Sequence, residues 1–296
     1  MSGRHASEFC SGEFRALVGD RKFQKLSRSD IAAPLDHEIA ELVARFVSPA
    51  AGRRPARIMD FGCGRGRLVG QLRLAHQHAY GVDIDPRFIR AGALLSDLWE
   101  PRRAILSATG AGGRTMFPDG FFDAVITDQV LEHVANLDAL AAEISRILKP
   151  GGVVFNRFPG RRLLIEPHYF LPAVHWLAPC SRRRRLAIRA FLGLGLGVRF
   201  SVRMPARVKA QVIAAYADAH TFYRPASMIC EVFARHGIAL SFGPFFRWWL
   251  LGKLHSKLRL PGPLLRLAAV MLRSRRLTYL LGEGYHWRVT GTKITK

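Results

Sequence analysis

The stretch RIMDFGCGRGRLVG, residues 57–70, decides the fold of this chain. Its first five residues form a short apolar run that predicts a β-strand, and its last residues begin a run with helical spacing. The glycines between them allow the backbone to turn sharply and to approach a ligand closely. We therefore expect a strand, a tight glycine loop and a helix, in that order.

A second apolar run, AYGVDIDP at residues 79–86, ends in Asp83, which lies 23 residues after Asp60. An acid at the end of the second strand of a βαβ unit can accept hydrogen bonds from both ribose hydroxyls of a nucleoside. The dinucleotide fingerprint G-x-G-x-x-G fails here, because Arg67 stands where its last glycine would be. The phosphate-binding GK[ST] triplet is also missing from the sequence. The loop therefore predicts neither a dinucleotide nor a nucleoside triphosphate as ligand.

Two further segments repeat the alternation of strand and helix. FFDAVITDQVLEHV (121–134) indicates a strand that ends at Asp128, followed by a short helix. LDALAAEISRILKPGGVVFNRF (137–158) indicates an amphipathic helix, a turn and another strand. Such alternation predicts an α/β fold with a doubly wound, mostly parallel sheet. Ligands bind such sheets at the carboxyl ends of the strands, where residues 62–66, Asp83 and Asp128 all fall.

The order and spacing of four segments identify a family resemblance. IMDFGCGRG, GVDIDP, FDAVITDQVLEHV and LKPGGVVF together resemble the class I S-adenosylmethionine-dependent methyltransferases. Within them the chain most resembles the type 11/12 branch, which includes the ubiquinone and menaquinone biosynthesis methyltransferases. The resemblance covers residues 57–158 and extends more weakly to 220–242 and 285–294, which look like the late helix, the sixth strand and the closing strand. It implies a Rossmann-like sheet of seven strands with S-adenosyl-L-methionine as the cofactor.

The resemblance also implies which residues bind the cofactor. The glycine loop matches the loop that holds the methionine portion, Asp83 matches the ribose-binding acid, and residues 128–130 match the segment beneath the methionine. The implied set is Asp60, Gly62, Cys63, Gly64, Gly66, Asp83, Ile84, Asp128, Gln129 and Val130. The usual adenine-contacting acid has no counterpart at residues 107–113, so backbone groups and apolar walls are expected to hold the adenine.

Several of these positions have a purely structural alternative. Asp60 could cap or orient the glycine loop without touching a ligand, and Cys63 could be a small packing residue between glycines. Gln129 could support the site from behind rather than contact the substrate. Asp85, which precedes a proline, is expected to cap the next helix.

Methyl transfer from a sulfonium is an in-line displacement in which the protein mainly aligns and desolvates the partners. A hydroxyl acceptor also needs a base near its proton. His133 and His168 are the catalytic candidates, because both follow strands at the carboxyl edge and have Glu132 and Glu166 beside them. For each histidine, packing or structural hydrogen bonding is the alternative. The pair His76 and His78 has no further ligands nearby in sequence, and no metal is assigned.

The net charge of +23 is distributed unevenly. Residues 1–150 contain 20 Lys and Arg against 18 Asp and Glu, whereas residues 151–296 contain 25 against 4. This asymmetry suggests an anionic partner. The four cysteines are scattered, which fits a reducing compartment, and the N-terminus lacks the apolar run of a signal peptide. We expect a cytoplasmic protein that can associate peripherally with the inner face of a membrane.

After an N-terminal segment (1–30), the sequence predicts a methyltransferase domain (31–296) with helical insertions at about 160–220 and 243–283. Both insertions are expected to cover the substrate side of the sheet. Cations recur among leucines and aromatic residues at 182–200 and 245–276, and residues 232–282 contain no acid. The pattern is typical of the membrane interface, but it also fits a plain helical cap or a nucleic-acid surface.

We expect an S-adenosylmethionine-dependent methyltransferase that acts on a small or lipid-linked acceptor, at oxygen, within an apolar and basic cap. One alternative is a nucleic-acid (RNA) methyltransferase, although residues 128–131 lack the N/D-P-P-Y/F tetrapeptide of enzymes that methylate base amines. A second alternative is a catalytically inactive scaffold of the same fold at a membrane surface.

Overall fold

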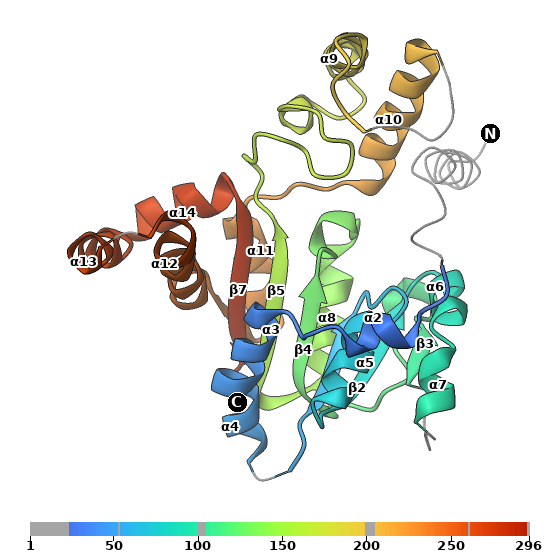
Figure 1. Cartoon of the computed structure of the whole chain (residues 1–296). Coiled ribbons are helices and arrows are strands. Elements are labelled where there is room, and N and C mark those ends of the chain that lie inside the picture. The colour runs from blue at the N-terminus through green and yellow to red at the C-terminus, as the bar shows by residue number, and fades with distance from the viewer. Residues whose placement is uncertain (1–23, 53, 100–104, 199–204, 260, 295–296) are drawn as a thin grey trace.

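The computed structural model describes residues 24–52, 54–99, 105–198, 205–259 and 261–294, so that most of the predicted N-terminal segment lies outside it. Within the described residues, seven strands form one sheet in the order β3-β2-β1-β4-β5-β7-β6 (Figure 1). Their bounds are β1 Arg57–Phe61, β2 His78–Asp83, β3 Leu106–Ala108, β4 Phe122–Asp128, β5 Leu148–Pro159, β6 Ile238–Ser241 and β7 His286–Lys293. The predicted α/β sheet of seven strands is confirmed.

The sheet is parallel except at β7. Strands β3, β2, β1, β4 and β5 pair in parallel, and β7 runs antiparallel to both β5 and β6. The carboxyl ends of β1, β2 and β4 therefore lie at one edge. This arrangement confirms the mostly parallel sheet and brings the glycine loop, Asp83 and Asp128 to the same side of the molecule.

Helices cover both faces, because alternate residues of each strand point to opposite sides. Met59 joins a core with α8 (Leu137–Ile147) and α11 (Ala226–Arg235). Its neighbour Ile58 joins a second core with α3 (His37–Leu42) and α5 (Arg67–Leu74). The shorter elements are α2 Arg28–Ala32, η2 Val43–Val47, α4 Ser48–Ala51, α6 Pro86–Ala91, α7 Leu94–Leu98, η3 Ala111–Gly113 and η4 Leu131–His133.

The segment 160–220 contains η5 (Val174–Trp176), α9 (Arg182–Gly193) and α10 (Ala206–His220). These elements lie beyond the carboxyl ends of β4 and β5 (Figure 1). They have their own apolar core, in which Tyr169 and Ile188 are fully buried. Arg184 is also buried and donates hydrogen bonds to Asp218, at 2.5 Å, and to the carbonyl of Val174. At least one cation of the arginine run is therefore structural.

The segment 243–283 forms α12 (Pro244–Leu258), α13 (Gly262–Met271) and α14 (Arg275–Glu283), which lie outside β7 at the left of Figure 1. Helix α12 buries Phe245, Phe246 and Trp249, whereas α13 has no buried residue. The cap alternative therefore fits α12 but not α13. Among the described residues, every helix is too short or too polar to cross a bilayer.

Candidate functional site

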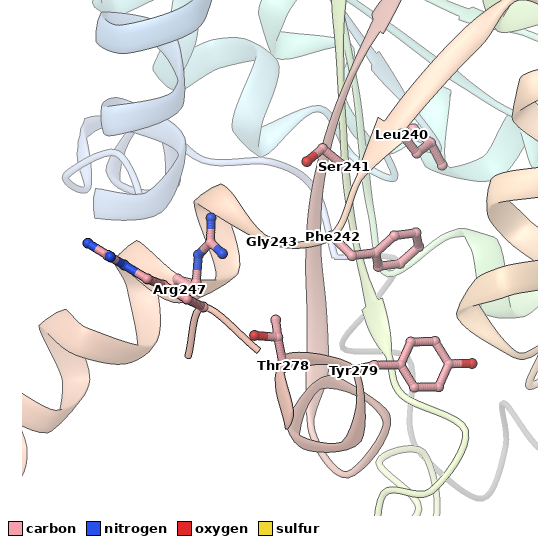
Figure 2. Close-up of a pocket in the computed structure, with 8 residues that line it drawn as sticks. Leu240, Ser241, Phe242, Gly243, Arg247, Thr278 and Tyr279 are labelled. Carbon is pink, nitrogen blue, oxygen red and sulfur yellow. The ribbon is translucent and has the colours of Figure 1, made fainter. Parts of the chain in front are cut away.

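A cavity of about 370 Å³ lies at the carboxyl ends of β1 and β4. Its walls come from the glycine loop, the first turns of α5, the strand ends, and the residues that lead into α3. They are Pro34, Asp36, Ile39, Asp60, Gly62, Cys63, Arg67, Leu68, Gln71, Asp128 and Arg157. A separate cavity of about 490 Å³ lies between β6, α12 and α14 (Figure 2). The first cavity is lined by Asp60, Gly62, Cys63 and Asp128 of the residues that the sequence implies for cofactor binding, and the others lie outside its lining. It is therefore the candidate site.

The glycine loop requires glycine at position 62 for two independent reasons. Gly62 has φ +85°, in the left-handed region that other residues rarely adopt. A Cβ built there would also lie 2.4 Å from a methyl carbon of Val130. The backbone N–H groups of Gly62 and Cys63 both donate to the carbonyl of Val82, at 2.7 and 2.9 Å. The loop is therefore held open beside β2, with Val130 packed against it.

Asp60 is 4% exposed at the floor of the cavity. Burial, together with the nearby charges of Asp128 and Asp83, raises the pKa of its carboxyl well above the ordinary value. A protonated carboxyl can donate one hydrogen bond as well as accept others. The raised pKa favours the protonated form of Asp60 beside the cavity, which the sequence did not suggest. Cys63 both lines the cavity and packs in the core, as its packing alternative required.

Asp83 binds the glycine loop directly. One carboxylate oxygen accepts from the N–H of Gly64 and the other from the N–H of Asp85, both at 2.9 Å. Each oxygen keeps a second lone pair for a further donor. Burial raises the pKa of Asp83, although these two bonds oppose the rise. Asp85 in turn caps α6 by accepting from the N–H of Arg87, which confirms that prediction.

The neighbourhood of Asp83 also has features suited to binding a nucleobase such as adenine. Ile84 is 81% exposed next to it, which is unusual for a large apolar side chain. The hydroxyl oxygens of Ser107 and Thr109, at the end of β3, are buried and have no hydrogen-bond partner among the described residues. Asp83 on β2 lies opposite Ala108 on β3, and Ala108 stands between Ser107 and Thr109. These hydroxyls are polar groups within residues 107–113, where the sequence has no adenine-contacting acid.

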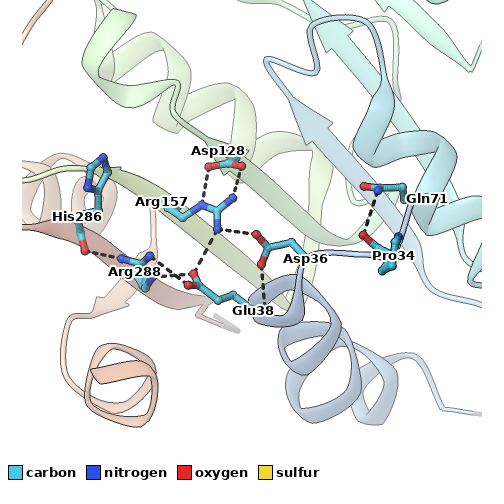
Figure 3. Close-up of polar contacts among 8 residues, drawn as sticks. All are labelled: Pro34, Asp36, Glu38, Gln71, Asp128, Arg157, His286 and Arg288. Carbon is cyan, nitrogen blue, oxygen red and sulfur yellow. Dashed lines mark hydrogen bonds and ion pairs between the residues drawn. The ribbon is translucent and has the colours of Figure 1, made fainter. Parts of the chain in front are cut away.

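Asp128 lies in a charged network that the sequence did not predict (Figure 3). Arg157 on β5 donates to both carboxylate oxygens of Asp128, at 2.7 and 2.6 Å. The same guanidinium reaches Asp36 at 3.2 Å and Glu38 at 3.3 Å. Glu38 then accepts two bonds from Arg288 on β7, at 2.6 and 3.1 Å. The network joins α3 to three strand ends and forms one wall of the cavity.

Ion pairing shifts the pKa values of Arg157 and Asp36 in the direction that favours their charged forms. Burial alone would lower the pKa of Arg157, but its bonds to Asp128 hold the pKa above the ordinary value. Burial would raise the pKa of Asp36, but the charge and hydrogen bond of Arg157 lower it below the ordinary value. The cavity therefore presents a fixed pattern of charge to a ligand. A fixed pattern costs no reorganisation when a ligand binds.

Gln129 follows Asp128 with φ +56°, an uncommon conformation for a residue other than glycine. Its backbone N–H donates to the carbonyl of Arg157 at 2.8 Å. This bond holds the turn between β4 and η4 in place. Strained backbone of this kind is found most often where a chain serves a site. The conformation directs the chain from Asp128 to Val130, which packs on the glycine loop.

A second cluster brings the two candidate histidines together. The Nε2 atoms of His133 and His168 lie 3.0 Å apart. His133 Nδ1 contacts the carbonyl of His220 at 2.8 Å, and His168 Nδ1 contacts a carboxylate oxygen of Glu166 at 2.6 Å. Since a carbonyl and a carboxylate accept, we assign a proton to each Nδ1. The two Nε2 lone pairs then face each other, so that a proton accepted by either ring would lie between the two.

Glu166 anchors this cluster and is fully buried. Its carboxylate accepts from the N–H groups of His168 and Tyr169, at 2.7 and 2.9 Å, and from the hydroxyl of Tyr223. Burial would raise the pKa of Glu166, but the bonds from His168 and Tyr223 lower it below the ordinary value. The sequence suggested Glu166 as a neighbour of His168, but it gave no sign of Tyr223, 57 residues away.

Glu132 differs from Glu166, because its two oxygens are buried and have no hydrogen-bond partner within the described chain. Burial, with the charges of Asp128 and Glu166, raises the pKa of Glu132 to about 8. Ligand atoms of Glu132, His133 and His168 lie within 4.8 Å of one another. A metal ion could bridge such a group, so an assay of this cluster needs a chelator control.

Comparisons with known proteins agree with the geometry of the cavity. Residues 59–156 match a family model described as "Methyltransferase domain". Ubiquinone biosynthesis O-methyltransferase of Thiobacillus denitrificans is 29% identical over 120 residues, which are 40% of this chain and 51% of the relative. Demethylmenaquinone methyltransferase of Tropheryma whipplei is 27% identical over 146 residues, 46% of this chain and 59% of the relative. The chain thus spans about half the length of the curated relatives that it matches.

Two solved structures are also similar to this chain. Phosphoethanolamine N-methyltransferase 2 of Haemonchus contortus, in complex with S-adenosyl-L-methionine, is 18% identical with a TM-score of 0.46. That match covers 88% of this chain and 52% of the other. The [4+2]-cyclase SpnF is also 18% identical, with a TM-score of 0.47, and the match covers 98% of this chain and 97% of the other.

Proposed function

We propose that this protein, whose residues 59–156 match a methyltransferase domain, is an S-adenosylmethionine-dependent enzyme that methylates a hydroxyl group of a small or lipid-linked acceptor. The observation that carries the proposal is the hydrogen-bonded series from Glu166 through His168 to His133. His133 lies three residues beyond Val130, which packs against the glycine loop. A base at this place is what an oxygen acceptor needs. The names of the quinone O-methyltransferases that match the chain support the same class of acceptor.

The cavity fits S-adenosyl-L-methionine in its donors and acceptors. The cofactor supplies an activated methyl group. Asp83 keeps free lone pairs for the ribose hydroxyls, and Ile84 offers an apolar surface for the adenine. Ser107 and Thr109 supply hydroxyls in place of the missing adenine acid. The Asp128–Arg157 pair offers charge to the amino-acid portion, and Asp60 offers it a buried carboxyl group.

The histidine pair would accept the proton of the acceptor. Glu166 orients the ring of His168 and stabilises positive charge on it, as a buried carboxylate does for a catalytic imidazole. His133 is exposed at the outer end of this hydrogen-bonded series, and His168 is half-buried between His133 and Glu166. A proton taken by His133 Nε2 can therefore be shared with His168 and neutralised by Glu166. Segment 160–198 carries exposed apolar side chains, among them Phe170 and Trp176, which would contact the acceptor.

Calorimetry and methyl transfer test this proposal separately. The intact protein should bind S-adenosyl-L-homocysteine, and failure to bind at high micromolar concentration would reject an enzyme of this family. Labelled cofactor with fractionated lipid and small-molecule extracts should give a methylated product. His168→Ala should lower the turnover about 10²–10⁴-fold with little change in cofactor affinity. EDTA should leave wild-type turnover unchanged; loss of activity would show that the cluster holds a metal.

The proposal includes a cytoplasmic location with peripheral attachment to an anionic membrane. The support is the exposure of both cations and apolar side chains on α9 and α13. Arg182, Arg183, Leu186 and Leu194 are exposed in the first region, and Leu264 and Leu267 in the second. Such mixed surfaces suit the headgroup region. An RNA acceptor is not favoured, because the cavity lacks the tetrapeptide typical of base-amine methylation.

A further inference from the structure

The cavity between β6, α12 and α14 is separate from the cofactor cavity and has no part in the proposed methyl transfer. Its volume of about 490 Å³ falls in the range of sites that bind small ligands. The lining consists of Leu240, Ser241, Phe242, Gly243, Arg247, Arg273, Thr278 and Tyr279. Figure 2 shows the labelled side chains arranged around it, with Arg247 on one side and Thr278 and Tyr279 on the other.

The charge of this cavity is entirely positive. Arg247 and Arg273 contribute two guanidinium groups, and the lining contains no acid. The sequence has no Asp or Glu from residue 232 to residue 282, and Glu283 at the end of α14 is buried and accepts from the N–H of Ala226, outside this cavity. The guanidinium of Arg247 is folded back towards Gly243, where its atoms lie 3.4–3.5 Å from the position of a Cβ. Two arginines that share one cavity suit the oxygens of a phosphate group.

The helices that border this cavity expose large apolar side chains. On α13, Leu267, Val270 and Met271 are 56%, 58% and 54% exposed, and on α14 Leu280 is 54% exposed. Arg266 lies within the same turns of α13 and is also exposed. The surface here is therefore both cationic and apolar. A phospholipid matches both, with a phosphate at the depth of the headgroups and acyl chains just below it.

We propose that this cavity binds the phosphate of an anionic membrane lipid while α13 and α14 lie in the headgroup region. Arg247 and Arg273 contact the phosphate oxygens, and the exposed leucines of α13 and α14 contact the upper acyl chains. The proposal gives a specific site to the peripheral attachment proposed above. It does not depend on methyl transfer, because none of the cavity residues lines the cofactor cavity.

A monomeric short-chain lipid separates this site from general attraction to a charged surface. Dihexanoyl phosphatidic acid below its micelle concentration should bind the full-length protein in calorimetry. The double variant Arg247→Gln/Arg273→Gln should weaken that binding at least about tenfold. The control Lys253→Gln/Lys257→Gln removes the same charge from exposed positions of α12 outside the cavity, and should change it less than about twofold. Equal effects of the two double variants would overturn the proposal.

Vesicles and competing anions identify the source of the phosphate. Phosphatidylcholine vesicles with about a third phosphatidic acid should sediment the protein. The double variant Leu267→Gln/Val270→Gln should reduce this sedimentation without lowering the affinity for the monomeric lipid. Inorganic phosphate or a single-stranded RNA oligonucleotide that binds the cavity as tightly as the lipid would overturn the assignment. Affinity for S-adenosyl-L-homocysteine should be equal in all variants, which separates failure of this site from failure of the proposed enzyme.

Discussion

Replacing Glu132 by glutamine should stabilise the protein, and the gain should grow with pH. Glu132 is 3% exposed, and its carboxyl oxygens have no hydrogen-bond partner in the described residues. Because burial raises its pKa to about 8 from 4.5, the folded protein keeps this proton over a range in which the unfolded chain loses it. The folded state binds more protons there, so the free energy of unfolding falls as pH rises.

The size of the effect follows from the pKa difference. Each pKa unit corresponds to about 1.4 kcal/mol, so the carboxyl costs the fold about 3 kcal/mol near pH 7 and about 5 kcal/mol above pH 8. A neutral amide of the same shape does not titrate. The free energy of unfolding of the Glu132→Gln variant should therefore exceed that of the wild type by about 1 kcal/mol near pH 5.5 and by several times that amount near pH 8.5.

Urea unfolding followed by tryptophan fluorescence at three pH values measures this difference. Glu143→Gln is the matched control, because Glu143 is also buried but is bonded to Thr115 and Arg146. Although burial opposes it, those bonds lower the pKa of Glu143, so its stabilising effect is complete above pH 4.5 and the control should be destabilised equally at all three values. A gain for Glu132→Gln that stays constant with pH would refute the reasoning.

Three further predictions follow from the described contacts. Gly62→Ala should abolish binding of S-adenosyl-L-homocysteine in calorimetry, because the loop cannot keep φ +85° and clear Val130. Glu38→Ala should lower the unfolding free energy by about 3–5 kcal/mol in urea, since Arg288 would be left buried without its partner. Iodoacetamide should label the exposed Cys180 well before Cys63, whose buried thiol has a raised pKa; mass spectrometry gives the order.

The sheet and the cofactor loop could be predicted from the sequence because their signals are local. Strand, glycine loop and helix are consecutive in residues 57–70, and each short pattern carries its own conformational requirement. Asp83 and Asp128 could be placed at the same edge because parallel strands leave no other choice for their carboxyl ends. The positive φ of Gly62 and the packing of Val130 explain why the loop needs glycine there.

The charged wall of the cavity could not be predicted, because its partners lie far apart in the chain. Arg157 and Asp36 are separated by 121 residues, and Arg288 and Glu38 by 250. Each is an ordinary charged residue in its own segment, and only the packing of α3 against β5 and β7 brings them together. One signal was present, since an arginine inside an otherwise apolar strand requires a buried partner.

The two histidines show a different limit. Their positions after β4 and β5 indicated the carboxyl edge, but the irregular segment between the end of β5 and His168 decides whether the two rings meet. The loop at Tyr223 and the end of α10 at His220 supply the contacts that orient the rings. No periodicity describes these segments, so the juxtaposition of His133 with His168 emerges only from the folded chain.

The basic, apolar stretch 245–276 divides into two parts that composition alone does not distinguish. Helix α12 packs Phe245 and Trp249 into the protein, and Arg288 lies 3.7 Å above the ring of Trp249. Helix α13 exposes the same kinds of residue to solvent. A deletion of the whole stretch would therefore remove part of the core and change membrane binding through unfolding. Only point substitutions on α13 and in the arginine cavity can separate attachment to a membrane from the stability of the sheet.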